Sequence, residues 1–126
     1  MKFLHSMIRV KDLQKSLDFY QKLLNMSFVK KKRLDDCDLY YLEDEEHCAQ
    51  IELTYNDETP QEGYVNGNAF GHFAFSVNSM DEFTQKMQNL GYEYLWEPYV
   101  IFSGTKIAFV KDPDGNEVEL IEKKHD

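Results

Sequence analysis

The sequence predicts an α+β fold made of two tandem βαβββ modules. The first observation behind this prediction is an internal repeat, because His5 and His72 are 67 residues apart and so are Glu52 and Glu119. The second is hydrophobic periodicity, which follows the same order of strand and helix patterns in both halves of the chain. Two curved four-stranded sheets of this kind would enclose a cleft, on which equivalent residues of the two modules converge.

Apolar residues around these four positions support the repeat. Each glutamate lies between two aliphatic residues, in Ile51-Glu52-Leu53 and Val118-Glu119-Leu120. The 67-residue shift also superposes Val10 on Val77, Leu13 on Met80, Leu23 on Leu90 and Leu42 on Phe109. So many matches in one register indicate a duplication.

The first module is expected to begin with a strand near residues 3–10, followed by a helix. Asp12 has a side chain suited to cap that helix, and apolar residues recur behind it at helical spacing. These are Leu13, Leu17, Tyr20 and Leu24. Alternation and aromatic content then favour strands near residues 26–34, 38–43 and 48–55.

The second module repeats this order. A strand near 70–77 precedes a helix that starts at Ser79 or Asp81 and ends at Gly91, and further strands are expected near 92–97, 105–111 and 116–122. The segment Asp112-Pro113-Asp114-Gly115 is a turn signal between the last two strands. We therefore expect a single domain over residues 1–126, with module 1 at about 1–55, a linker at about 56–69 and module 2 at about 70–123.

Composition excludes several classes of function. The net charge of −9 repels phosphate backbones and anionic membranes, so neither nucleic acid nor a membrane is an expected partner. No apolar run approaches the length of a membrane span. Cys37 and Cys48 form no metal or redox spacing, which is typical of reduced thiols in a cytoplasmic protein. The basic run Lys30–Arg33 is expected to be a solvated strand end or loop.

His5, Glu52, His72 and Glu119 are candidate ligands of one divalent metal ion. Taken singly, each is ordinary, since a strand histidine is usually a satisfied polar residue and an alternating glutamate faces water. Their pairing by the repeat argues against that interpretation. Two imidazoles and two carboxylates suit Ni²⁺, Zn²⁺ or Co²⁺. Such an ion can stabilise the enediolate of proton transfer next to a carbonyl, with a nearby glutamate as the base.

Five segments of the chain resemble the glyoxalase I family, also called lactoylglutathione lyases, of the vicinal oxygen chelate superfamily. They are Leu4–Leu13, Ser16–Tyr20, Ile51–Asn56, Gly71–Val77 and Ala108–Glu122. The resemblance runs almost from end to end of the chain and implies the glyoxalase/bleomycin-resistance type of fold. The Asp-Pro-Asp-Gly turn is common across the superfamily, whereas the quartet of histidines and glutamates is far more specific.

The resemblance implies a metal-dependent lyase or isomerase that detoxifies methylglyoxal. Its substrate would be the hemithioacetal of a 2-oxoaldehyde and a thiol, usually glutathione, and its product an S-lactoyl thioester. By position, Glu119 would be the main base, Glu52 the second carboxylate on the metal, and Arg9 and Asn56 contacts to the thiol's peptide. The resemblance favours Ni²⁺ or Co²⁺, with Zn²⁺ also accepted, and a homodimer with two sites. A site within one chain and a site across two chains are both compatible with the repeat.

One segment departs from the family pattern. Relatives often carry lysines before the penultimate strand, but Trp96–Gly104 is aromatic and has no basic residue. The thiol co-substrate is therefore open. Two other functions remain as alternatives: an acyl-thioester epimerase of the methylmalonyl type, in which an amide typically stands at the position of Glu52, and a metal-free small-molecule-binding protein of the same fold, which generally lacks the quartet.

Overall fold

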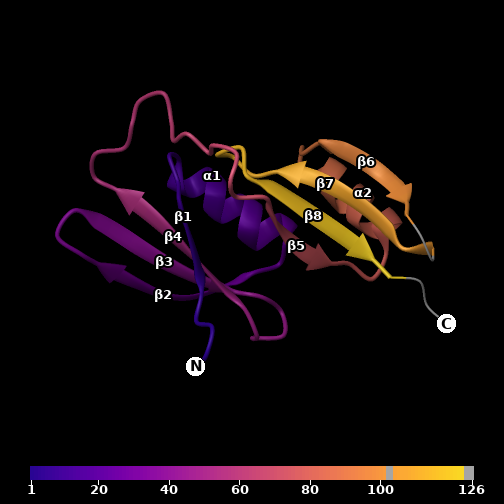
Figure 1. Cartoon of the computed structure of the whole chain (residues 1–126), viewed down its shortest axis with the longest axis horizontal. Helices are drawn as coiled ribbons and strands as arrows, with labels where there is room; N and C mark the ends of the chain where they lie inside the picture. Colours follow the sequence, from indigo (N-terminus) through magenta and orange to yellow (C-terminus); the bar gives the residue numbers. More distant parts are fainter. Residues whose placement is uncertain (102–103, 124–126) are drawn as a thin grey trace. The chain divides into compact units, whose positions relative to one another are not determined.

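The computed structural model describes residues 1–101 and 104–123 of the chain, which divides into two compact units, Met1–Val65 and Asn66–Asp126 (Figure 1). The first unit contains four strands, an α-helix and a π-helical segment. Their bounds are β1 Ser6–Arg9, α1 Leu13–Asp18, η1 Phe19–Leu23, β2 Ser27–Arg33, β3 Cys37–Glu43 and β4 Gln50–Asn56. The second unit repeats the order with β5 His72–Ser76, α2 Met80–Asn89, β6 Trp96–Val100, β7 Lys106–Lys111 and β8 Glu117–Glu122.

Each unit holds one four-stranded sheet, and the two sheets have the same topology. The strand order is β1-β4-β3-β2 in the first and β5-β8-β7-β6 in the second. In both, the first strand pairs in parallel with the fourth, and the other neighbours are antiparallel. This repeated βαβββ topology confirms the predicted α+β fold class. The cleft stays a prediction.

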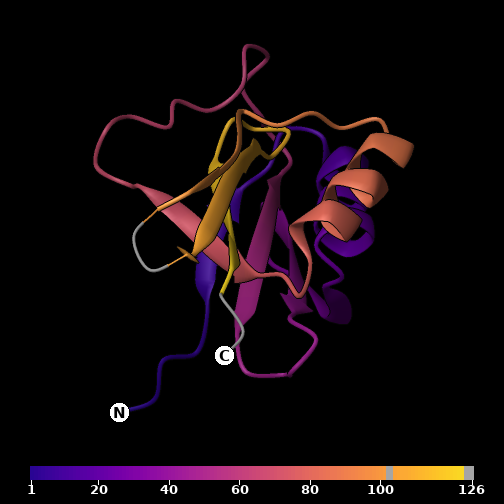
Figure 2. The ribbon, with the colours of Figure 1, turned by 90° about the vertical axis from the view of Figure 1, so that its right-hand side faces the viewer.

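The cores of both units come from the apolar positions that periodicity identified. In the first unit Leu42 and Leu53 are fully buried, and in the second Val118 and Leu120. Helix α2 (Figure 2) contacts β8, and its buried residues are Met80, Phe83 and Met87. No helix among the described residues is long and apolar enough to cross a membrane.

The first helix differs from the prediction in its second half. Asp12 caps it as predicted, accepting a hydrogen bond from the backbone N–H of Lys15 at 3.1 Å. The α-helix ends at Asp18, however, and the chain continues as a π-helical turn in which the Leu24 N–H donates to the Phe19 carbonyl at 3.3 Å. Side-chain periodicity over so few residues does not separate the two helix types, since both bury one face.

The strand expected near residues 92–97 lies further along the chain. Helix α2 ends at Asn89 with Leu90 as its C-cap, and Gly91 follows directly with a φ of +86°, which suits a residue without a side chain. The Leu95 N–H bonds to the Phe109 carbonyl at 2.8 Å, but β6 itself runs from Trp96 to Val100. It has an irregular register between Trp96 and Tyr99, around Pro98, which cannot donate to the ladder.

The 67-residue superposition of the two modules is wrong by one residue at β3 and β7, the third strand of each unit. The 67-residue shift superposes Leu42 on Phe109, whereas the sheets pair Tyr41 with Glu52 and Phe109 with Glu119. Tyr41 is therefore the structural counterpart of Phe109. The cause is that the connection from β3 to β4 is one residue longer than the connection from β7 to β8.

Candidate functional site

The first unit brings two of the predicted ligands into contact. Glu52 lies in the middle of β4 between Ile51 and Leu53, which are buried on the other face of the strand. His5 immediately precedes β1, the parallel neighbour of β4. The Nε2 atom of His5 lies 2.9 Å from Oε2 of Glu52. The side chain of Glu52 is only 10% exposed and that of His5 is 32% exposed, so the imidazole covers the carboxylate on its solvent side.

The second unit builds the same pair from the equivalent strands. His72 is the first residue of β5, and Glu119 lies on β8, which is the parallel neighbour of β5. The Nε2 atom of His72 lies 3.2 Å from Oε1 of Glu119. The side-chain exposures are 42% and 16%, slightly more than in the first pair. The structure therefore contains two His–Glu pairs with one geometry.

An aromatic ring from the next strand accompanies each pair. The ring of Tyr41 on β3 meets the ring of His5 edge to face at 5.5 Å between centroids, and Phe109 on β7 meets His72 in the same way at 5.4 Å. Such contacts stabilise the orientation of an imidazole by about 1 kcal/mol. Each histidine is thus held between a carboxylate and an aromatic edge.

The two carboxylates differ in their remaining partners. Tyr41 donates a hydrogen bond to Glu52, and this bond, followed by burial, raises the pKa of the Tyr41 phenol. The hydroxyl of Thr54 also donates to Oε1 of Glu52 at 3.3 Å. In the second unit Phe109 stands opposite Glu119 and offers no hydroxyl. Among the described residues, Glu52 is therefore fixed by more hydrogen bonds than Glu119.

The donor atoms of each pair fit half of a divalent metal site. An imidazole nitrogen and a carboxylate oxygen are borderline and hard donors that Zn²⁺, Ni²⁺ and Co²⁺ accept together. Within either unit, no third His, Cys, Asp or Glu of residues 1–101 and 104–123 joins the pair as a metal-binding group. Each pair alone therefore supplies two protein ligands.

The two predicted substrate contacts lie in the first unit, near Glu52. Arg9 is exposed on β1 and pairs in register with Thr54, so its side chain shares the sheet face of Glu52. Asn56 ends β4, and its Nδ2 atom donates to the hydroxyl of Tyr64 at 2.8 Å. That bond uses one donor of the amide and leaves its other groups for a ligand.

The segment Trp96–Gly104, which departs from the family pattern, includes all of β6. Trp96, Tyr99 and Val100 are exposed. Phe102 and Ser103 lie outside the described residues. Lys106, the next base along the chain, has its Nζ 4.0 Å from a carboxylate oxygen of Glu122.

Tyr41 is the site residue that the sequence did not reveal. The 67-residue shift paired the wrong residue with Phe109, so the aromatic counterpart in the first module was hidden. Cross-strand register would have found it, because the residue opposite each glutamate is aromatic in both sheets.

The chain is similar to known proteins over almost its whole length. Residues 2–120 match the model of the Glyoxalase/Bleomycin resistance protein/Dioxygenase superfamily. The lactoylglutathione lyase of Neisseria meningitidis serogroup A is 40% identical over 129 residues, which is 98% of this chain and 92% of that protein. The lactoylglutathione lyase of Escherichia coli O157:H7 is 41% identical over 131 residues, which is 98% of this chain and 94% of that protein.

Two solved structures show the same fold. Glyoxalase I from Zea mays superposes with a TM-score of 0.85 at 29% identity, over 98% of this chain and 45% of that chain, so the present chain spans about half the length of the maize protein. The trypanothione-dependent glyoxalase I of Leishmania major superposes with a TM-score of 0.79 at 33% identity, over 98% of this chain and 87% of that one. With its repeated topology and its near full-length similarity to these proteins, the chain belongs to the glyoxalase/bleomycin resistance/dioxygenase superfamily.

Proposed function

We propose that this protein is a lactoylglutathione lyase, a metal-dependent carbon–sulfur lyase that detoxifies methylglyoxal. The observation that carries the proposal is the His–Glu pair present once in each unit, at His5–Glu52 and at His72–Glu119. Relatives of about 40% identity over almost the whole chain bear the name lactoylglutathione lyase. A binding protein has no need of one buried and one partly buried carboxylate that each face an imidazole, because such groups are costly to desolvate.

We further propose that both pairs hold one divalent ion, with His5, Glu52, His72 and Glu119 as its ligands. Two neutral and two anionic ligands balance the charge of the ion. An ion held by these residues would supply Lewis-acid polarisation of substrate oxygens, which would acidify the neighbouring C–H bond. The family resemblance favours Ni²⁺ or Co²⁺, with Zn²⁺ as an accepted substitute. It also favours a homodimer with two sites.

In this proposal the residues of the chain perform the proton transfer. The carboxylate of Glu119 removes the proton from the hemithioacetal carbon, C1, and returns it to the neighbouring carbon, C2. The hydroxyl proton moves from the C1 oxygen to the C2 oxygen, so C1 is oxidised to the thioester level and C2 is reduced to an alcohol. Glu119 suits the role of base because it has fewer fixed partners than Glu52, which Tyr41 and Thr54 hold.

Arg9 and Asn56 are the proposed contacts to the thiol. Both lie in the first unit, Arg9 on the sheet face of Glu52 and Asn56 at the end of the strand that carries it. A guanidinium group and an amide can bind a carboxylate and a peptide bond of glutathione. Glutathione is the leading candidate for the thiol.

The test is an assay of methylglyoxal and a panel of thiols with chelated and metal-reconstituted protein. We expect chelation to abolish thioester formation, Ni²⁺ or Co²⁺ to restore it, and glutathione to be among the thiols used. Thioester formation that survives complete removal of metal would contradict the proposal. Racemisation of a methylmalonyl-type thioester, without lyase activity, would identify an epimerase. Ligand binding without bound metal would identify a metal-free binding protein.

A further inference from the structure

Two cross-strand rows of side chains cover the face of the first sheet that carries Glu52. Partner residues in a pleated sheet point to the same face, so the registers define both rows. The first row is Met7, Glu52, Tyr41 and Lys30, and the second is Arg9, Thr54, Leu39 and Lys32. Glu52 lies inside this face, and the two lysines lie along its edge on β2.

Lys30 and Lys32 are positioned by the ring of Tyr41. Their Nζ atoms lie 4.9 Å and 5.8 Å from the centroid of that ring, as cation–π contacts. The same ring meets His5 edge to face at 5.5 Å and donates its hydroxyl proton to Glu52. The side chain of Tyr41 therefore contacts both ammonium groups and both members of the His5–Glu52 pair.

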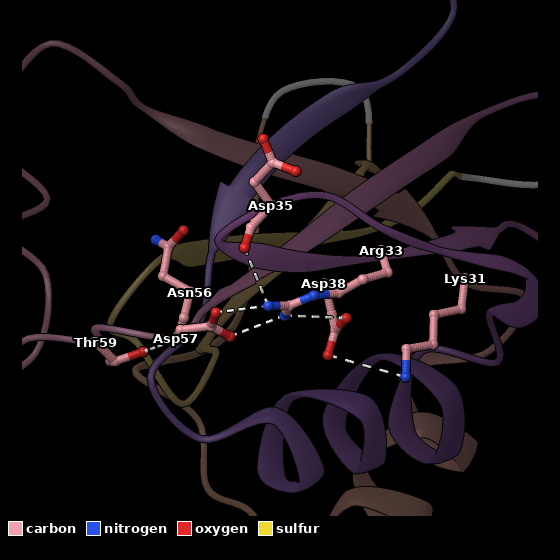
Figure 3. Close-up of polar contacts among 7 residues, drawn as sticks. All are labelled: Lys31, Arg33, Asp35, Asp38, Asn56, Asp57 and Thr59. Atoms are coloured by element: carbon pink, nitrogen blue, oxygen red, sulfur yellow. Dashed lines mark hydrogen bonds and ion pairs between the residues drawn. The ribbon is translucent and has the colours of Figure 1, made fainter.

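The basic residues on the opposite face of β2 already have carboxylate partners. Arg33 forms two hydrogen bonds to Asp57, at 2.8 Å and 2.6 Å, and Lys31 and Arg33 both approach Asp38 (Figure 3). The pair with Asp57 raises the pKa of the Arg33 guanidinium and lowers the pKa of the Asp57 carboxyl. These charges are neutralised within the protein.

No described carboxylate forms an ion pair with Lys30 or Lys32. Glu43, two residues beyond Tyr41 on β3, is bound by Nδ1 of His47 at 2.6 Å, and Glu52 is bound by His5. Strand β2 is exposed along its whole length, so both ammonium groups face solvent. In a chain of net charge −9, two cations without a carboxylate partner beside the His5–Glu52 pair form a local site of opposite sign.

We propose that Lys30 and Lys32 form an anion subsite that binds a carboxylate on the substrate while its reacting carbons lie near the His5–Glu52 pair. This inference rests on the proposed function and adds the residues that make the protein prefer a negatively charged substrate. Strands in a sheet are about 5 Å apart, and β2 lies two strands from β4, so the backbone of Lys30 lies about 10 Å from the backbone of Glu52. A carboxylate several bonds from the reacting carbon meets the lysines at that distance.

The carboxylate can belong to the thiol or to the 2-oxoaldehyde, because the hemithioacetal contains both. Arg9 stands on the opposite edge of the same face, three strands from Lys32 in the second row. Anionic groups at both ends of one substrate would therefore meet cations on both sides of Glu52. Substrates that differ only in the place of their charge distinguish the two sources.

The experiment compares three substrate pairs on the metal-loaded protein. They are methylglyoxal with mercaptoethanol, methylglyoxal with mercaptosuccinate, and a 2-oxoaldehyde with a terminal carboxylate together with mercaptoethanol. The readout is the ratio of kcat/KM for each charged pair to that for the uncharged pair. Every variant receives the same solutions, so differences in hemithioacetal concentration cancel when ratios are compared between variants.

The test variant is Lys30→Met with Lys32→Met, and the control is Lys22→Met with Lys31→Met. Both remove two positive charges, but Lys31 lies on the opposite face of β2, and Lys22 lies in η1, where it pairs with Asp18 of α1. Exposed pairs of opposite charge change an equilibrium about two- to fivefold each. We expect the ratio for one charged pair to fall about tenfold in the test variant and to persist in the control. An equal ratio in wild type and test variant, or an equal fall in both variants, overturns the subsite.

A binding measurement keeps the two proposals separate. Wild-type protein that turns over methylglyoxal with no thiol, glutathione included, contradicts the proposed function, whereas turnover of the three pairs without charge preference contradicts only the subsite. Calorimetric titration with (methylthio)succinate, which cannot react, tests the subsite without turnover. Binding that is lost in the test variant and kept in the control supports it. Binding equal in wild type and test variant, or no binding to the wild type, overturns it.

Discussion

Glu52 and Glu119 occupy equivalent places in the two sheets, but different neighbours hold them. The carboxylate of Glu52 accepts hydrogen bonds from Tyr41 and Thr54 in addition to its contact with His5. Glu119 faces Phe109, which has no polar atom in its side chain. A base must exchange a proton with the substrate, and a carboxylate with fewer fixed partners is better suited to that.

The first prediction compares the two glutamates. Glu119→Gln keeps an oxygen for the metal but removes the base, so we expect bound metal to remain and kcat to fall at least about a hundredfold. Metal content by elemental analysis and kcat with methylglyoxal and glutathione measure both effects. Glu52→Gln is the matched control and should retain more activity. Near-normal turnover in Glu119→Gln would show that the roles are assigned wrongly.

The second prediction concerns the hydroxyl of Tyr41. Tyr41→Phe keeps the ring against His5 and removes the hydrogen bond to Glu52, so the ligand is held less firmly. Loss of such a supporting bond weakens metal binding about ten- to a hundredfold. Competition with a chelator measures the affinity, and Tyr40→Phe, on the other face of β3, is the control. An affinity unchanged in Tyr41→Phe but reduced in Tyr40→Phe would refute the assigned role.

At the scale of single residues, the sequence predicted the two His–Glu pairs but not their support. His5, Glu52, His72 and Glu119 were identifiable because the repeat preserves both residue types and spacing. Tyr41 was not, since a one-residue difference in a connecting loop displaced it from the register. Contacts across strands depend on loop length, which residue spacing alone does not reveal.

At the scale of elements, the turn between β3 and β4 is organised by one carboxylate. Oδ1 of Asp44 accepts hydrogen bonds from the backbone N–H groups of Cys48 at 2.8 Å and Ala49 at 3.0 Å. These bonds, that of Ala49 foremost, lower the pKa of Asp44 below its usual 3.8. The turn sets the register that aligns Tyr41 with Glu52, so the carboxylate supports the site indirectly.

The third prediction is the pH dependence of that turn. The folded state favours the ionised form of Asp44, so its stabilisation is complete above about pH 4 and is lost as the pH falls through the lowered pKa. Asp44→Asn should lower the free energy of unfolding by about 1 kcal/mol at pH 7, and the difference from wild type should shrink in acid. Urea unfolding at pH 7 and at acid pH measures the free energy of unfolding of wild type and Asp44→Asn. Glu45→Gln is the control. A difference independent of pH would contradict the assignment.

Most elements follow from local sequence signals, and the exceptions have local causes. Caps and periodicity predicted the first helix start at Asp12 and offered Ser79 or Asp81 for the second, of which Ser79 is the cap. The π-helical turn of η1 escaped prediction because it buries the same face as an α-helix. The start of β6 also escaped prediction, because the residues after Gly91 join the sheet only from Leu95 onward. Pro98 also interrupts the hydrogen-bond pattern of the strand.

At the scale of the whole molecule, the two His–Glu pairs must come together to bind one ion. Each pair supplies an imidazole and a carboxylate, and four ligands of these types suit a divalent metal. A homodimer with two-fold symmetry can supply the first pair from one chain and the second from its partner, giving two equal sites. A site within one chain is the alternative that the repeat also allows, and the fourth prediction separates the two arrangements.

The fourth prediction is recovery of activity on mixing inactive variants. His5→Ala and His72→Ala should each be inactive as homodimers. A mixed dimer of the two has one intact site if each site combines two chains, so unfolding and refolding an equal mixture should restore about a quarter of wild-type activity. Mixing two preparations of His5→Ala is the control. No recovery, with mixed dimers demonstrated by mass, would contradict a shared site.

The central claim is that two distant pairs form one metal site, and metal stoichiometry tests it most directly. Elemental analysis of reconstituted wild type, His5→Ala, His72→Ala and the control His47→Ala suffices, since His47 pairs with Glu43, which is not a proposed ligand. We predict about one divalent ion per chain in wild type and control, and a large loss in both test variants. Full metal content in either His5→Ala or His72→Ala, or no bound metal in the wild type, would contradict the account.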